Sequence, residues 1–294
     1  MRVLIVTKVT NYDLHGENTE AKVARGLVSK DALERLKVAH HEHHQTLSQL
    51  RSTLDRYKIA YDEVSRERQT QPLAPDAVVI TVGGDGTLLA ASHQMPEGGV
   101  LVGIRSSNSS VGYLCCAGPA HLEKVVQALD KGSLGVEHIP RLKAQIYRAE
   151  TGDSVMTLPV LNDFLYANTH PAATTRYRLT LGDRSELHRS SGIWVATGIG
   201  STAAIFAALG EKRPVHDPLV QFRVRELYRL SNPPPQLDGG LFDPALVEFE
   251  IENRCQAALL ALDGQYGVEN LQYGDRMRFL PATSLRLARS FEGR

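Results

Sequence analysis

The chain has 294 residues, of which 42% are hydrophobic and 22% charged, the composition of a folded globular protein with a substantial core. Its 33 Lys and Arg residues balance 33 Asp and Glu residues, so net charge gives no reason to expect a nucleic acid or an anionic membrane as partner. No apolar run is long enough for a membrane span and no signal-peptide pattern is present. We therefore expect a cytoplasmic protein that binds neither nucleic acid nor membrane.

The first part of the chain alternates between two kinds of pattern. Short runs of branched apolar residues are typical of buried strands, and apolar residues spaced by three and four are typical of helices. Strand, helix and strand in this order predict a doubly wound α/β domain with a parallel sheet. The expected strands are 2–7, 77–82 and 99–104, and the expected helices are 31–57, 87–94 and 119–131.

Four histidines gather in the long expected helix, at His40, His41, His43 and His44. His40 and His44 are one turn apart, a spacing that metal sites use, but the stretch is not a His-Glu-x-x-His motif. Because two of the four histidines fall on the apolar face, we expect packed or partner-facing side chains and assign no metal ligands. The polar stretch 10–20 before this helix is expected to be a loop.

The pattern of apolar and polar residues changes after Gly135. Short alternating segments separated by turn residues predict an all-β, sandwich-like second domain. One helix is expected within it, at 201–209, and 211–240 is expected to be irregular because it contains a proline run. The expected strands are 142–148, 155–161, 177–182, 193–197, 246–251, 257–262 and 276–280.

One glycine-rich loop carries the clearest chemical signal, Gly83-Gly84-Asp85-Gly86-Thr87. It follows an expected buried strand and opens an expected helix, so backbone N–H groups and the positive end of the helix dipole would point at a ligand such as phosphate. A carboxylate in such a loop would repel phosphate, but it could accept the proton of an attacking alcohol. The loop lacks the lysine of a Walker motif, and the bland alternative is an aspartate that merely caps the helix.

This loop resembles the signature shared by NAD kinases, diacylglycerol and sphingosine kinases and, more distantly, phosphofructokinases. Three later segments resemble motifs of the NAD kinase family in particular, and their order and spacing fit over residues 78–270. The opening residues, the histidine-rich helix and Val111–Cys115 look closest to the mitochondrial-type branch of that family. The three later segments are Leu161-Asn162-Asp163, Ala196–Ala203 and Leu262-Asp263-Gly264-Gln265.

The resemblance implies an enzyme that phosphorylates the 2′-hydroxyl of the adenosine ribose of NAD, with ATP as donor and Mg²⁺ as the accompanying cation. It implies an α/β domain at 1–137 and 280–294, completed by the returning chain end, and a β-rich NAD-binding domain at 138–279. The site is expected between the two domains, in a homodimer or homotetramer. Asp85 would be the catalytic residue, with Gly83, Gly84, Gly86 and Thr87 binding phosphates. The implied NAD-binding residues are Asn162, Asp163, Arg189, Thr197, Gly200, Ser201, Thr202 and Ala203.

Three positions depart from the family pattern. Asp163 stands where Glu is usual, Ser191 where the main branch has Asp, and Ala204 where it has Tyr. The changes at Ser191 and Ala204 motivate one alternative, a dinucleotide-binding sensor without catalysis, and the shared glycine-rich loop leaves a second, a lipid kinase. The segment from Gly198 to Ala203 also fits a Rossmann fingerprint, but no strand–helix–strand unit surrounds it.

Overall fold

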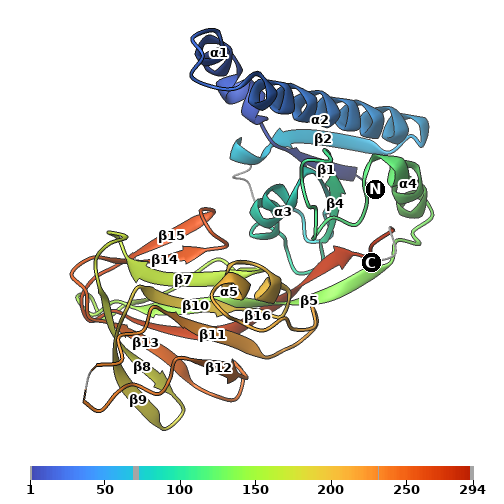
Figure 1. Cartoon of the computed structure of the whole chain (residues 1–294). Coiled ribbons are helices and arrows are strands. Elements are labelled where there is room, and N and C mark those ends of the chain that lie inside the picture. Colours follow the sequence, from blue (N-terminus) through green and yellow to red (C-terminus); the bar gives the residue numbers. More distant parts are fainter. Residues whose placement is uncertain (1, 69–72, 231, 292–294) are drawn as a thin grey trace. The chain divides into compact units, whose positions relative to one another are not determined.

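The structure is a computed structural model that describes residues 2–68, 73–230 and 232–291 (Figure 1). Contacts divide the chain into two compact units, each with its own hydrophobic core. The first unit comprises Met1–Glu137 and Leu285–Arg294, and the second comprises His138–Ser284. In the part of the chain that the structure describes, no helix is both long and apolar enough to cross a membrane.

The first unit is built on a parallel sheet with the strand order β2-β1-β3-β4, followed by the end of β16. Thr7 lies beside Ser65 and Val82, and Gly83 lies beside Arg105. The residues that follow these strands are therefore gathered at one edge of the sheet. The strands are β1 (Arg2–Thr7), β2 (Ala60–Ser65), β3 (Val78–Gly83), β4 (Val100–Arg105) and β16 (Arg276–Ala288).

Helices cover both faces of this sheet, as expected for a doubly wound fold. The apolar sides of α2 and α4 join the strands in one core, and α3 lies on the other face (Figure 1). Burial follows the sequence pattern, since Leu47, Leu50 and Leu54 of α2 are all buried. The helices are α1 (Asn11–Ala24), α2 (Lys30–Arg56), α3 (Asp85–Ser92) and α4 (Leu122–Asp130), with short 3-10 turns η1 (Arg66–Arg68) and η2 (Pro119–His121).

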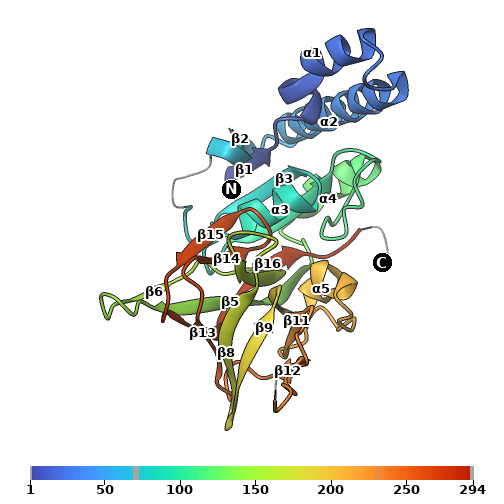
Figure 2. The ribbon, with the colours of Figure 1, turned by 60° about the vertical axis from the view of Figure 1, so that its left-hand side comes forward.

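Helix α1 corrects the expectation of a loop at 10–20. Thr10 starts the helix with a capping box, in which its hydroxyl accepts the N–H of Asp13 and the Asp13 carboxylate accepts the N–H of Thr10. Such a reciprocal pair satisfies two backbone donors at a helix start. Helix α1 packs against the first half of α2 (Figure 2), where Lys37 pairs with Glu20 at 3.0 Å.

The second unit consists of two antiparallel sheets whose inner faces share one core, which confirms the expected sandwich-like β domain. One sheet has the order β12-β11-β10-β7-β14-β15, and the other joins β16, β13, β8 and β9, with β5 beside β16 and β6 beside β5. The strands are β5 (Val136–Tyr147), β6 (Ser154–Met156), β7 (Asp163–Asn168), β8 (Thr175–Leu181), β9 (Arg184–Ser190), β10 (Gly192–Ala196), β11 (Val220–Arg225), β12 (Gly239–Phe242), β13 (Phe249–Asn253), β14 (Ala258–Leu262) and β15 (Gly267–Leu271).

The second unit departs from expectation in several segments. Strands β7, β9 and β15 were not expected, and the strand expected at 155–161 is only the three-residue β6. The helix expected at 201–209 is a 3-10 turn, η3 (Ile199–Thr202), followed by the single helical turn α5 (Ala204–Ala207). The stretch 211–240, expected to be irregular, contains β11 and the start of β12. The chain end returns to the first unit as expected, because Arg286 and Leu287 of β16 pair with β4.

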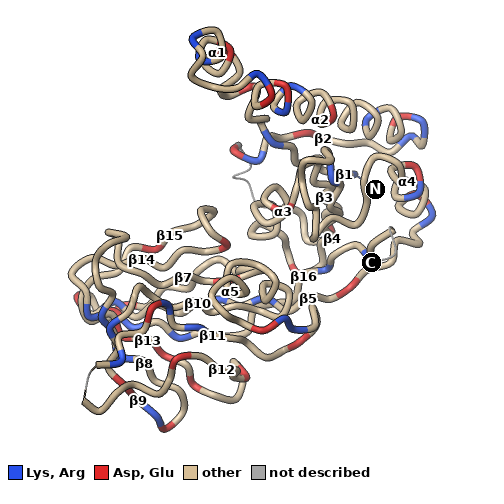
Figure 3. The backbone as a smooth tube through the Cα atoms, in the orientation of Figure 1, with Lys and Arg blue, Asp and Glu red and all other residues tan. Residues whose placement is uncertain are grey.

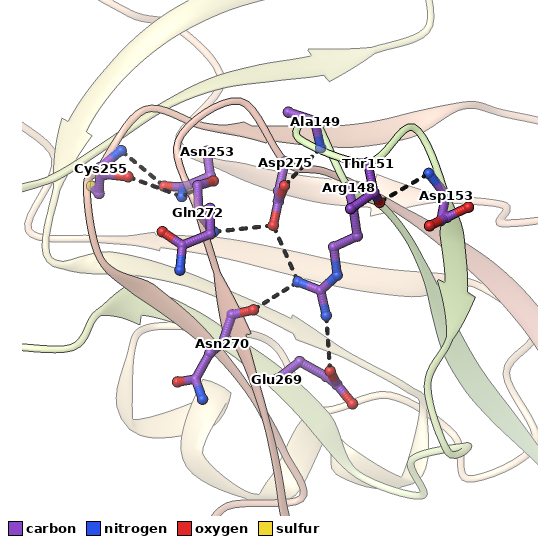
Figure 4. Close-up of polar contacts among 10 residues, drawn as sticks. All are labelled: Arg148, Ala149, Thr151, Asp153, Asn253, Cys255, Glu269, Asn270, Gln272 and Asp275. Atoms are coloured by element: carbon purple, nitrogen blue, oxygen red, sulfur yellow. Dashed lines mark hydrogen bonds and ion pairs between the residues drawn. The ribbon is translucent and has the colours of Figure 1, made fainter.

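Polar contacts also fix the second unit. The guanidinium of Arg148 donates to the carbonyl oxygen of Asn270 at 2.7 Å and contacts the carboxylates of Asp275 and Glu269 at 3.1 and 3.2 Å (Figure 4). Asp275 is buried, so the guanidinium of Arg148 replaces water that would otherwise solvate the Asp275 carboxylate. Basic and acidic residues are interspersed along α2 and across the second unit (Figure 3).

Candidate functional site

The glycine-rich loop forms the junction between β3 and α3. Gly84 is the N-cap residue of α3, and its carbonyl accepts the N–H of Thr87 at 3.0 Å. Space for side chains is short here: a Cβ on Gly83 would lie 2.7 Å from the Cβ of Thr87, and a Cβ on Gly84 would lie 2.2 Å from the Ser110 hydroxyl, which would have to rotate away. The amides of Asp85 and Gly86 precede the first of the intrahelical bonds, so a phosphate can bind them.

Asp85, the first residue of α3, is held by a second loop, residues 106–118, which connects β4 to η2. Its Oδ1 accepts the backbone N–H of Leu114 at 2.7 Å, and its Oδ2 accepts that of Tyr113 at 3.1 Å. The same loop is tied to β3, since the N–H of Ser106 donates to the carbonyl of Gly83 at 2.9 Å. A carboxylate has about four lone-pair positions, so Asp85 is oriented by these bonds and can still accept a proton or bind a cation.

Helix α2 holds this second loop from the other side. The Glu42 carboxylate accepts the Ser107 hydroxyl at 2.7 Å and the Asn108 N–H at 2.9 Å. The Ser107 hydrogen bond, against the opposing effect of burial, keeps the pKa of Glu42 below its ordinary value. His43 lies between the hydroxyls of Thr7 and Ser106, at 3.0 and 2.9 Å, and burial lowers its pKa to about 4. His43 is therefore neutral and packed, as expected from the sequence.

Three cationic residues stand at the edge of the sheet that carries the loop. Lys8 follows β1, Arg66 follows β2, and Arg105 ends β4. Burial and the nearby positive charge of Arg66 lower the pKa of Lys8. Ligands of open α/β sheets bind at this carboxyl edge. These three residues could not be predicted from the sequence, because β2 was not expected and their convergence depends on strand order.

In the second unit, Asp263 brings two of the expected motifs together. Its Oδ1 accepts the N–H groups of Asn162 and Asp163 at 2.7 and 3.1 Å, and its Oδ2 accepts that of Leu161 at 2.9 Å. Asp263 itself has a left-handed backbone (φ 46°) and donates its N–H to the carbonyl of Asp163. Asp263 belongs to the Leu262–Gln265 segment that resembles a family motif, but it was not among the expected site residues.

Thr197 and Gly200 complete the same cluster. The Thr197 hydroxyl donates to the Leu161 carbonyl at 2.6 Å and accepts the N–H of Gly200 at 3.1 Å. A Cβ on Gly200 would lie 2.0 Å from the carbonyl oxygen of Asn162, so only glycine fits. Asp163 is buried beside this cluster, and burial together with the nearby Asp263 carboxylate raises its pKa to about 7.

Three more of the expected NAD-binding residues, Ser201, Thr202 and Ala203, come directly after Gly200. Ser201 follows Gly200 but is fully buried, and its hydroxyl accepts the N–H of Arg213 at 2.8 Å. Thr202 and Ala203 are half-buried at the end of the same turn.

Arg189 is not brought to this cluster. It lies on β9 and lines a pocket of about 300 Å³ together with Ser191 and Tyr228. Ser191 and Thr197 flank the five-residue strand β10, whose length is about 16 Å. A role for Arg189 at the site of the same chain is therefore not supported, and its contact across a subunit boundary stays a prediction.

A parallel α/β unit carries the Gly-Gly-Asp-Gly helix start, and an antiparallel β-sandwich unit follows it. The chain is 29% identical over 259 residues to a probable NADH kinase of Oryza sativa, covering 80% of this chain and 77% of that protein. It is 32% identical over 196 residues to an NAD kinase of Methanoregula boonei, covering 65% and 66% of the two chains. The chain belongs to the NAD kinase family.

Solved structures give the same fold. Yeast NADH kinase in complex with NADH superposes with a TM-score of 0.70 at 15% identity, covering 99% of this chain and 84% of that one. An NAD kinase of Archaeoglobus fulgidus in complex with ATP gives 0.64 at 17% identity, covering 99% and 95%. A scan against protein-family models finds no match. The mitochondrial-type branch stays a prediction.

Proposed function

We propose that the protein is an NAD kinase that transfers the terminal phosphoryl group of ATP to the 2′-hydroxyl of the adenosine ribose of NAD, giving NADP. Family membership supports the reaction, and the named relatives include NAD kinases and NADH kinases. NADH is therefore a second acceptor to be tested. The proposal rests most heavily on Asp85, whose carboxylate is oriented at a phosphate-binding helix start by the amides of Tyr113 and Leu114.

The donor phosphates are proposed to bind at the carboxyl edge of the first unit's sheet. The amides at the start of α3 and the cations of Lys8, Arg66 and Arg105 would compensate the charge of the triphosphate. Gly83 and Gly84 would let the phosphates approach the backbone closely, because neither residue carries a side chain. Gly86 and Thr87 would add contacts from the first turn of the helix.

Mg²⁺ is proposed to accompany the donor. It commonly uses one or two carboxylates together with phosphate oxygens and water, and Asp85 is half-buried with lone pairs left after its two backbone bonds. Asp85 would hold the ion, whose positive charge would shield the phosphates. The same carboxylate would accept the proton of the ribose hydroxyl as the hydroxyl oxygen bonds to the terminal phosphorus of ATP and the bond from that phosphorus to ADP breaks.

The acceptor is proposed to bind where Asp263 and Thr197 organise the Leu161–Asp163 segment. Asn162 is half-buried there and supplies an amide side chain, and Thr202 and Ala203 are accessible at the end of the adjoining turn. Asp163, Thr197, Gly200 and Ser201 are buried and would position this wall of the pocket. We further expect a cytoplasmic homodimer or homotetramer, in which Arg189 would reach a neighbouring subunit.

A coupled assay tests the reaction. The purified chain is mixed with NAD or NADH, ATP and Mg²⁺, and an enzyme specific for the 2′-phosphorylated product reports turnover. Positioned proton acceptors contribute about 100-fold to 10,000-fold, so Asp85→Asn should lower kcat by at least about 100-fold and leave NAD binding nearly unchanged. Asp76→Asn, at an exposed aspartate before β3, is the matched control and should retain wild-type turnover.

Three results would count against the proposal. Full turnover by Asp85→Asn would remove Asp85 from the chemistry. NAD binding without transfer from ATP, another nucleoside triphosphate or polyphosphate would indicate a sensor. Phosphorylation of a lipid in place of NAD would indicate a lipid kinase.

A further inference from the structure

Helices α1 and α2 bring together three side chains that metal sites commonly use. His40 and His44 are one turn apart on α2 and share a face, and Asp13 comes from the first turn of α1. One potential ligand atom from each of the three residues lies within 4.8 Å of the other two. The sequence shows the histidine pair but not the third residue, because Asp13 falls in a stretch that was expected to be a loop.

The distances fit a shared ion better than direct pairing. His40 Nδ1 lies 3.4 Å and His44 Nε2 3.8 Å from the Asp13 carboxylate oxygens. A charge-assisted hydrogen bond between such groups is typically about 2.7–2.9 Å long. Ligand atoms about 2.1 Å from a tetrahedral Zn²⁺ lie about 3.4 Å from one another.

Neighbouring groups hold the ligands in place. Asp13 Oδ2 accepts the N–H and the hydroxyl of Thr10 at 2.9 and 2.7 Å, so the carboxylate cannot turn freely. The same hydroxyl lies 2.8 Å from His40 Nδ1; because its own proton is donated to Asp13, this contact is a hydrogen bond from His40 Nδ1, which a metal ion on that nitrogen would replace. The rings of His40 and His44 meet edge to face, with centroids 4.3 Å apart. The hydrogen bonds to the Asp13 carboxylate are support of the kind that orients carboxylate ligands at metal sites.

The other nearby histidines and charges have different surroundings. His43 is buried and is occupied by the hydroxyls of Thr7 and Ser106. His41 is exposed and is not part of the three-residue group. Lys37, the nearest lysine on α2, is paired with Glu20 at 3.0 Å. The group is therefore two imidazoles and one carboxylate, a set that suits a divalent transition metal more than Mg²⁺.

We propose that Asp13, His40 and His44 form a binding site for a divalent transition metal such as Zn²⁺, with water at the remaining position. The ion would cross-link α1 to α2 next to the segment that leaves β1. Its ligands differ from those proposed for the donor's Mg²⁺, so the site is independent of the phosphotransfer proposal. Metal binding would displace any proton from the ligating nitrogens.

A Co²⁺ titration of the full chain tests the site. The protein carries no polyhistidine tag and is first stripped of metal with a chelator. Visible absorption should report one Co²⁺ per chain, and Zn²⁺ should displace it. Because loss of a supporting residue alone typically weakens metal sites about 10-fold to 100-fold, His44→Ala and Asp13→Asn should weaken binding by at least about 10-fold. His41→Ala, on the same helix, should bind as the wild type does.

Thermal melting gives an independent readout of the same site. Zn²⁺ should raise the Tm of the wild type and of His41→Ala, and should leave the Tm of His44→Ala unchanged. His44→Ala should melt as the wild type does without metal, because the side chain is half-exposed. Wild-type protein that binds no Co²⁺, or a His44→Ala or Asp13→Asn variant that binds it as tightly as wild type, would overturn the proposal.

Discussion

Asp263 and Asn162, 101 residues apart, are joined by a hydrogen bond of 2.7 Å from the backbone N–H of Asn162 to the Asp263 carboxylate. The same carboxylate accepts the amides of Leu161 and Asp163. Asp263 thus sets the conformation of the segment proposed to bind NAD. Asp263 can therefore influence the affinity for NAD without contacting the dinucleotide.

Replacing Asp263 by Asn should weaken NAD binding through this segment. An amide has one oxygen instead of two, so at least one buried backbone N–H loses its acceptor, at a cost of about 1–3 kcal/mol. The KM for NAD should rise about 10-fold or more while the KM for ATP changes little. Steady-state kinetics with each substrate varied in turn measures both. Asp183→Asn, at an exposed turn, is the control; an unchanged KM for NAD in Asp263→Asn would contradict the role.

Asp163 should make stability depend on pH. Burial and the nearby Asp263 raise its pKa to about 7, so the protonated form stabilises the fold below the unfolded pKa, and this contribution is lost as pH rises through about 7. Asp163→Asn cannot ionise. Its free energy of unfolding relative to wild type should therefore increase from pH 5 to pH 8, by at most about 1.4 kcal/mol per pH unit.

Denaturant titrations of wild type and Asp163→Asn at several pH values measure this difference. Comparing the two proteins at each pH cancels the titration of groups that they share. A difference that is constant with pH, or that falls as pH rises, would show that Asp163 is ionised in the folded protein throughout this range.

Gly200 should tolerate no side chain. In Gly200→Ala the new Cβ would lie 2.0 Å from the Asn162 carbonyl oxygen, so the turn and the Asn162 segment must move apart. We expect a loss of stability of about 1–3 kcal/mol and a higher KM for NAD. Gly135→Ala is the control, since its Cβ would meet only the flexible Arg289 side chain, at 3.2 Å. Equal melting temperatures for the two variants would refute the steric account.

Lys8 should contribute to donor binding. Its pKa is lowered by burial and by the nearby positive charge of Arg66, and a bound triphosphate would relieve that repulsion. Lys8→Ala should raise the KM for ATP about 10-fold, the equivalent of about 1.4 kcal/mol, with little change in the KM for NAD. The control is Lys30→Ala, at an exposed lysine at the start of α2. A rise in the KM for NAD alone would place Lys8 at the acceptor instead.

Elements with strong periodicity could be predicted from the sequence. The strands expected at 2–7, 77–82 and 99–104 and the helix expected at 31–57 match β1, β3, β4 and α2 within about one residue. Weakly patterned elements could not. Helix α1 has a polar sequence and depends on its Thr10 capping box. Strand β2 is a largely exposed edge strand, and β11 lies in a stretch whose prolines suggested an irregular loop.

The candidate site could likewise be predicted from the sequence only in part. Local signals identified the glycine-rich loop, because glycines after a strand and before a helix have a clear physical meaning. The partners of Asp85 and the role of Asp263 could not be predicted from periodicity. Both depend on backbone amides that are 28 to 102 residues away, and such pairing is set only by the folded chain.

Transfer of labelled phosphate tests the central claim most directly. The chain is incubated with ATP labelled in its terminal phosphoryl group, Mg²⁺, NAD and a diacylglycerol dispersion, and the labelled products are separated. We predict label in NADP, removed by a phosphatase that cleaves the 2′-phosphate, and loss of this product in Asp85→Asn. Label in the lipid, or in no acceptor while NAD is bound, would contradict the assignment.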